Sequence, residues 1–131
     1  QGITVKEQSY GYEVILPHLM PKRSHRNHTV FLLEPLTYAL KEFTVAHPIC
    51  RLEYALIWFI YEYTEDTPIH CIRDYDNIET KEVLDIINSF FLLDDGGAFC
   101  ELHYSTRRGN RTCTRVIISS DMSGFVSENK R

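Results

Sequence analysis

The residues best suited to chemistry lie in two short acidic stretches. The first is Arg73-Asp74-Tyr75-Asp76-Asn77, and the second is the pair Asp94-Asp95. Neither stretch contains histidine or cysteine, so the ligands on offer are hard oxygen atoms, which suit Mg²⁺ or Mn²⁺. A divalent cation held by carboxylates can activate water and stabilise the charge on a phosphodiester under attack. These residue types therefore indicate metal-assisted phosphodiester hydrolysis, provided that the two stretches meet in space.

Their convergence depends on the elements between them. Asp74 and Asp76 follow a strand expected to begin over 69–72, and in extended backbone side chains two residues apart share a face. A helix expected from Asp76 then carries the chain to Asp94-Asp95, which precede another strand. If that strand pairs beside the strand before the helix, both acidic stretches reach one end of the sheet.

The same aspartates also have purely structural interpretations. Asp76 is placed to cap the helix with Glu79 as its capping-box partner, which contributes about 1 kcal/mol. The sequence 94–97 (DDGG) is also an ordinary acidic turn. Asp74 beside Arg73 could form a surface ion pair of small energetic value. Spacing alone leaves both interpretations open.

The remaining pattern predicts an α/β or α+β fold in which a small mixed sheet is covered by two main helices. One helix is expected from Pro35 in its first turn, with 29–33 either extended or leading into it, and the other from Asp76. Strands are expected over 12–16, 51–63 and 69–72, with 51–63 central, and over 99–105 and 112–119, which form an antiparallel hairpin. The apolar faces of the helices are expected at Leu36, Leu40 and Phe43, and at Ile78, Val83, Leu84, Ile87 and Phe91.

Length and composition favour one domain. The chain has 131 residues, of which 44% are hydrophobic and 24% charged, as in ordinary globular proteins. We expect the domain to span residues 1–121, with a flexible tail over 122–131. No run approaches the roughly 18 apolar residues of a membrane span, and the start lacks the pattern of a secretory signal. Four widely spaced cysteines show no zinc or redox pattern. A cytoplasmic protein without a membrane partner is expected.

The charge pattern bears on nucleic-acid binding. The net charge of −4 and the pI of about 5.8 are unusual for a protein that neutralises phosphates. Basic residues nevertheless crowd two segments, which could bind phosphate or could simply be solvated turns. These residues are Lys22, Arg23, His25, Arg26 and His28, and then Arg107, Arg108, Arg111 and Arg115.

The two acidic stretches, with Lys81 and Leu84-Asp85 between them, resemble the signature of the RusA family of Holliday-junction resolvases. That signature runs Asp-x-Asp-Asn, Lys, Leu-Asp, and then a hydrophobic residue with Asp-Asp. Residues 12–23 (YEVILPHLMPKR) are similar to the family's first strand and DNA-contacting loop, and residues 102–118 (LHYSTRRGNRTCTRVII) to its closing hairpin. Lys81 lies five residues after Asp76, one more than the family spacing.

The resemblance implies a Mg²⁺-dependent endonuclease, with Mn²⁺ able to substitute, that cleaves branched DNA as a homodimer. A two-fold enzyme suits a two-fold four-way junction. By motif position, the implied metal ligands are Asp74, Asp76, Asp94 and Asp95, with Lys81 as the catalytic lysine that contacts phosphate or steadies the attacking water. The implied DNA-binding residues are Lys22, Arg23, Arg26, Arg73, Asn77, Arg107 and Arg108.

Two other functions compete with the nuclease. One is a non-catalytic module of RusA-like fold that binds a DNA structure or a protein partner, as on a phage or mobile element; the displaced Lys81 and the acidic balance motivate it. The other is an unrelated small α/β protein in which the aspartates only cap and turn. Cleavage of a four-way junction separates the first function from both alternatives.

Overall fold

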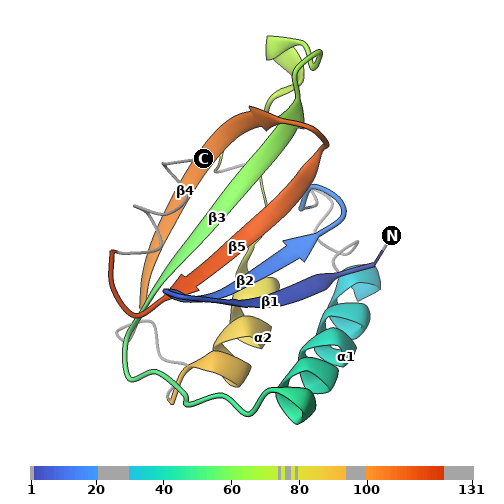
Figure 1. The fold of residues 1–131 in the computed structure, drawn as a ribbon. Helices are drawn as coiled ribbons and strands as arrows, with labels where there is room; N and C mark the ends of the chain where they lie inside the picture. Colours follow the sequence, from blue (N-terminus) through green and yellow to red (C-terminus); the bar gives the residue numbers. More distant parts are fainter. Residues whose placement is uncertain are drawn as a thin grey trace.

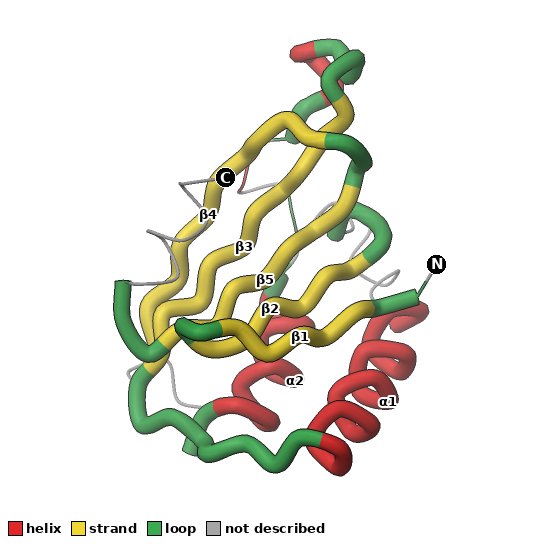
Figure 2. The backbone as a smooth tube through the Cα atoms, viewed as in Figure 1, coloured by secondary structure: helices red, strands yellow, loops and turns green. Residues whose placement is uncertain are grey.

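The described residues form a five-stranded sheet and two α-helices, together with the short 3₁₀ helix η2 (Ile69–Cys71) (Figures 1 and 2). The computed structural model describes residues 2–20, 30–73, 75, 78, 80–93 and 100–122. The elements are, in chain order, β1 (Thr4–Gln8), β2 (Gly11–Leu16), α1 (Val30–Ala46), β3 (Ala55–Thr64), the 3₁₀ helix η2 (Ile69–Cys71), α2 (Lys81–Phe91), β4 (Cys100–Gly109) and β5 (Cys113–Ser119). The fold is therefore mixed α+β, as expected from the sequence.

The sheet has the order β1-β2-β5-β3-β4. β3 pairs with β4 in parallel, and every other neighbouring pair is antiparallel. A parallel pair needs a crossover connection, and the chain between β3 and β4 supplies it through α2. The strand before the helix and the strand after it are thus neighbours, but because they run parallel the connection into α2 and the connection out of it leave opposite ends of the pair. The pairing therefore does not by itself bring the two acidic stretches to one end of the sheet.

The predicted hairpin between the last two strands is wrong, because β3 lies between β4 and β5. The short connection 110–112 passes the end of β3, where Gly109 is paired with Thr64. A Cβ atom at Gly109 would collide with the side chain of Glu62. Glycine is therefore required where the chain turns past β3.

Both α-helices lie on one face of the sheet (Figure 1). β3 was predicted as the central strand, and it is buried from Ala55 to Tyr63 with a partner strand on each side. Its alternate side chains meet the helices in one hydrophobic core. The helix residues in that core are Leu36 and Leu40 from α1, and Val83, Ile87 and Phe91 from α2. The predicted apolar helix faces are confirmed at these positions.

Helix α1 begins earlier than predicted. It starts at Val30, so Pro35 lies inside the helix and not in its first turn. Proline has no N–H to donate to the carbonyl of Phe31, four residues earlier. The apolar run over 30–33 is helical, which resolves the alternative left open for that segment.

The strand predicted over 69–72 is wrong, since Ile69–Cys71 forms η2. Both flanks of β3 are already occupied, by β5 and β4. Ile69 is 82% exposed, so this segment buries no apolar face that would favour a sheet. Asp74 and Asp76 consequently do not follow a strand end, and the same-face argument for them loses its premise.

Two further observations bear on the sequence predictions. All four cysteines are free, with Cys113 buried and Cys50 and Cys71 exposed. No helix within the described ranges is long and apolar enough to cross a membrane.

Candidate functional site

Most of the predicted site residues lie outside the described residues. This holds for the predicted metal ligands and for the first basic segment, so their roles remain predictions. The residues concerned are Asp74, Asp76, Asn77, Asp94 and Asp95, together with Lys22, Arg23 and Arg26. Arg73, Lys81, Arg107 and Arg108 are described, as is Tyr75 between the first two aspartates. Their contacts define the surroundings of the candidate site.

Tyr75, in the first acidic stretch, packs against the sheet. Its ring lies 5.7 Å from that of Tyr104 and 5.9 Å from that of Tyr61, centroid to centroid. The Thr106 hydroxyl donates a hydrogen bond of 2.9 Å to the Tyr75 phenol oxygen. Tyr75 remains 41% exposed. Tyr75 is thus held at the β3–β4 pair by a ring that also reaches the surface.

Arg73 is engaged within the chain. Its backbone N–H donates to the Tyr63 hydroxyl at 3.2 Å, and its guanidinium donates to the carbonyl oxygen of Met20. Arg73 therefore links the first acidic stretch to the segment that follows β2. If Arg73 contacts DNA as predicted, its guanidinium must do so while it donates to the Met20 carbonyl.

The tyrosines beneath this stretch were not identified from the sequence. Tyr61 is almost fully buried, and within the described part of the chain its hydroxyl has no hydrogen-bond partner. Burial, with the neighbouring tyrosines Tyr104, Tyr63 and Tyr75, raises the pKa of this phenol, so it stays protonated. The alternation along β3 places Tyr61 and Tyr63 on one face, which is the only sequence signal for the cluster.

Lys81 is the first residue of α2, and Thr80 occupies the N-cap position. The prediction that Asp76 caps this helix is therefore wrong. The Lys81 ammonium lies 3.8 Å from the Asp85 carboxylate, and the two side chains are 82% and 60% exposed. An exposed pair of this kind contributes little to stability, and the Lys81 ammonium lies at the surface.

The two acidic stretches occupy the two connections of the β3–α2–β4 crossover. Tyr75 packs on Tyr61 and Tyr104, close to the start of α2, where the Thr80 and Tyr104 hydroxyls share a hydrogen bond. Leu93 follows the other end of α2, and its N–H donates to the Leu52 carbonyl at 2.9 Å. Eleven helical residues span about 16 Å. A shared cation would therefore draw its ligands from chain segments that leave opposite ends of α2.

No group of three or more His, Cys, Asp or Glu side chains is placed to hold a metal ion in the ranges that the structure describes. The predicted ligands Asp74, Asp76, Asp94 and Asp95 lie outside those ranges. The chemistry of that donor set, carboxylates alone, fits Mg²⁺ or Mn²⁺.

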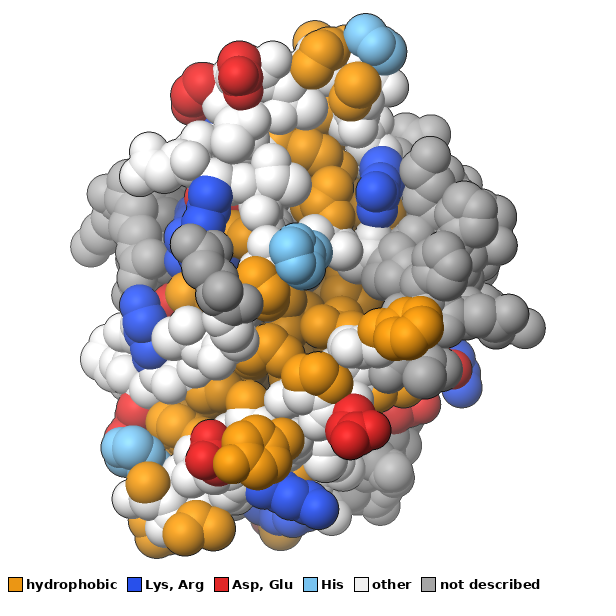
Figure 3. Space-filling view, turned by 90° about the vertical axis from the view of Figure 1, so that its right-hand side faces the viewer, with side chains coloured by type: hydrophobic (Ala, Val, Ile, Leu, Met, Phe, Trp, Pro, Cys, Tyr) orange, Lys and Arg blue, Asp and Glu red, His pale blue; other side chains and the backbone are white. Residues whose placement is uncertain are grey.

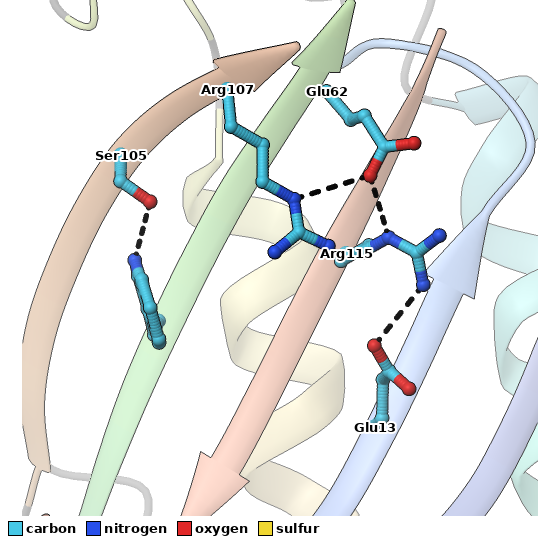
Figure 4. A network of polar contacts seen from close by, with 6 residues as sticks. Glu13, Glu62, Ser105, Arg107 and Arg115 are labelled. Carbon is cyan, nitrogen blue, oxygen red and sulfur yellow. Dashed lines mark hydrogen bonds and ion pairs between the residues drawn. The ribbon is translucent and has the colours of Figure 1, made fainter. Parts of the chain in front are cut away.

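A separate ion network lies on the face of the sheet away from the helices (Figure 4). Arg115 Nε is 2.9 Å from Glu62 Oε1, and Arg107 Nε is 3.2 Å from the same oxygen. Arg115 also reaches Glu13 at 3.3 Å. Beside it, the Trp58 indole donates to the Ser105 hydroxyl at 2.7 Å. The carboxylates are nearly fully buried, so the arginines compensate charge that would otherwise be buried alone.

The pKa values reflect this pairing. Burial alone would raise the pKa of Glu62, but the hydrogen bond and charge of Arg115, with those of Arg107, outweigh it and lower the pKa below 4.5. Burial would likewise lower the pKa of Arg115, and the contact with Glu62 raises it instead. Both groups are ionised at neutral pH.

Arg108 also stabilises the fold. Its guanidinium donates to the carbonyl oxygens of Thr64, Glu65 and Thr67, which close the turn after β3. The second basic segment therefore stabilises the end of the sheet. The positive charge that Arg107 and Arg115 offer to phosphate is matched largely by Glu62 and Glu13.

These observations define a small α+β protein with one βαβ crossover, a tyrosine cluster beneath its first connection and an internal ion network on the opposite face. The chain belongs to DUF6100, a family of unknown function, whose profile matches residues 1–127. No curated protein and no solved structure matches this chain.

Proposed function

We propose that this protein is a metal-dependent endonuclease for branched DNA, with a RusA-like fold and site. The observation that carries the proposal is the order of the two acidic stretches along the chain, one before α2 and one after it. Between them stand Lys81 and Leu84-Asp85, in the order of the RusA signature. Carboxylates are ligands that Mg²⁺ prefers, and a shared site requires the connections at the two ends of α2 to approach each other.

The proposed roles follow from the residue types. Asp74, Asp76 and Asp95, with Asp94 beside them, would hold Mg²⁺, which when bound supplies an activated water and charge stabilisation at the phosphodiester. Lys81 has an exposed ammonium at the start of α2 and would contact a phosphate oxygen. Tyr75 would position Asp74 and Asp76 by anchoring the chain between them on Tyr104.

The test uses the full chain and a synthetic four-way junction with Mg²⁺. We expect paired nicks in the wild type and their loss in Asp76→Asn and Asp95→Asn, with circular dichroism spectra unchanged. Asp66→Asn, an exposed carboxylate in the turn after β3, is the matched control and should cleave normally. A junction that stays intact across Mg²⁺ and Mn²⁺ concentrations would refute the nuclease.

One observation favours a second candidate, a non-catalytic module that binds DNA structure or a protein. Three arginines of the second basic segment, Arg107, Arg108 and Arg115, are paired with buried glutamates or backbone carbonyls, and the net charge is −4. Junction binding that persists in EDTA and never leads to cleavage would establish this candidate. Absence of any DNA binding would point to a protein partner.

A further inference from the structure

Helix α1 exposes a stripe of large hydrophobic side chains on its outer face. Phe31 is 80% exposed, Tyr38 is 64% exposed and Val45 is 84% exposed. These residues are seven apart, so at about 100° per residue they lie along one line of the helix. Leu36 and Leu40, on the opposite side of α1, fill the core. The stripe is therefore not needed for packing within the chain, and a heptad stripe of this kind is typical of helix–helix interfaces.

An open groove of about 770 Å³ runs beside this stripe. Its described lining comes from Phe31, Glu34, Pro35, Thr37, Tyr38 and Lys41. Figure 3 shows the side of the molecule on which α1 and the edge strand β1 lie, with hydrophobic side chains gathered over its middle and charged ones among them in its lower part.

The charges beside the stripe are arranged unevenly. By helical angle, Glu34 and Lys41 lie on one flank, and Glu42 lies on the other flank together with Pro35. The Tyr38 hydroxyl makes a hydrogen bond with Glu42, which also raises the pKa of Tyr38. One flank thus carries a negative and a positive charge at nearly equal distances from Tyr38.

This arrangement is complementary to a second copy of itself. If two α1 helices pack antiparallel about a two-fold axis at Tyr38, Phe31 of each copy faces Val45 of the other. Glu34 lies about 6 Å before Tyr38 along the helix and Lys41 about 4.5 Å after it, so each Glu34 meets the Lys41 of the other copy. In a parallel pair the two flanks are exchanged, so Lys41 of each copy would meet Glu42 of the other, and Glu34 would meet Pro35 and find no opposite charge. The antiparallel arrangement is therefore the one that gives both Glu34 and Lys41 an opposite charge while Glu42 keeps its hydrogen bond with Tyr38.

We propose that the outer face of α1 is the interface of a homodimer, with two copies packed antiparallel through Phe31, Tyr38 and Val45. The interface is isologous, as closed two-fold dimers require. A helix of 17 residues is about 25 Å long, and one helix pair gives an interface at the small end of stable ones. The dimer should accordingly dissociate in the micromolar range. The proposal does not depend on nuclease activity.

Sedimentation velocity over a wide concentration series of the full chain tests the interface. We expect a reversible monomer–dimer equilibrium in the wild type, weakened at least 100-fold by Tyr38→Glu, which buries a charge at the axis. Ile69→Glu changes an equally exposed residue outside α1 and should leave the equilibrium unchanged. A monomeric wild type at all concentrations, or a dimer insensitive to Tyr38→Glu, would overturn the proposal.

Charge reversal tests the orientation. Glu34→Lys and Lys41→Glu should each weaken the dimer about 10-fold, because each creates two like-charge contacts. The double variant Glu34→Lys/Lys41→Glu restores opposite charges and should regain wild-type dimerisation. If the double variant is no better than the single ones, the antiparallel pairing is wrong. Junction cleavage assayed on the same samples separates this outcome from failure of the proposed nuclease.

Discussion

Arg115 Nε lies 2.9 Å from Glu62 Oε1, and this ion pair joins β5 to β3 on the face of the sheet away from the helices. The Glu62 side chain is only 4% exposed and that of Arg115 18% exposed. A carboxylate so deeply buried is tolerated only with a partner. The pair therefore explains why arginines gather near the β4–β5 connection without any reference to a ligand.

Replacing Arg115 should destabilise the fold strongly. In Arg115→Met the carboxylate of Glu13 loses its ion pair and Glu62 keeps only Arg107, and breaking a buried pair from one side costs about 3 kcal/mol. Urea unfolding followed by circular dichroism measures the loss. The control Arg51→Met removes an exposed arginine with one long contact and should change stability by less than about 0.5 kcal/mol. Equal effects of the two variants would show that the network contributes nothing specific.

The ion pair between Glu62 and Arg115 predicts that the stability of the fold depends on pH. The pKa of Glu62 is about 4.5 in the unfolded chain and lower in the fold, so the unfolded state binds a proton first as the pH falls. The stabilisation from Glu62 is complete above pH 4.5 and is lost as the pH falls through the folded pKa. Glu62→Gln should be less stable than the wild type at pH 7, and the difference should shrink below pH 4.5. Denaturant unfolding at several pH values measures it; a difference independent of pH would contradict this linkage.

Much of the fold follows from the sequence because local pattern and burial agree. The run Ala55 to Tyr63 could only be a central strand, and Val83, Ile87 and Phe91 could only face a core. The predictions fail where residues far away in the sequence determine which element forms and where it pairs. β1, with the sequence TVKEQ, is a mostly polar edge strand that forms because β2 offers a free edge, and it was not predicted.

The site is less predictable for the same reason. Acidic residues and Lys81 are visible as a motif, but Arg107 and Arg108 look like phosphate ligands until their partners Glu62 and the Thr64 carbonyl are known. Those partners are more than 40 residues away in the chain. The packing role of Tyr75 likewise becomes apparent only from its ring contact with Tyr104 on β4.

Tyr75 should influence the candidate metal site without being a ligand. Tyr75→Ala removes the ring contacts with Tyr104 and Tyr61, so Asp74 and Asp76 lose their anchor. We expect about 10-fold weaker Mn²⁺ binding by calorimetry, as for other residues that orient ligands. Tyr75→Phe keeps the ring and loses only the hydrogen bond from Thr106, so its affinity should stay near the wild type. If Tyr75→Ala binds Mn²⁺ as the wild type does, the anchor is irrelevant to the site.

Mg²⁺ itself should stabilise the protein, because a cation that binds only the folded chain shifts the unfolding equilibrium. With free Mg²⁺ at about ten times its dissociation constant, the gain is about 1.4 kcal/mol, or a rise in Tm of about 5 °C for a domain of this size. Asp74→Asn and Asp95→Asn should each abolish the rise, since the proposed site needs both connections of the crossover. The exposed control Asp66→Asn should keep it. A rise that survives Asp95→Asn but not Asp74→Asn would mean that the first connection binds the cation alone, and that the two acidic stretches do not form one site.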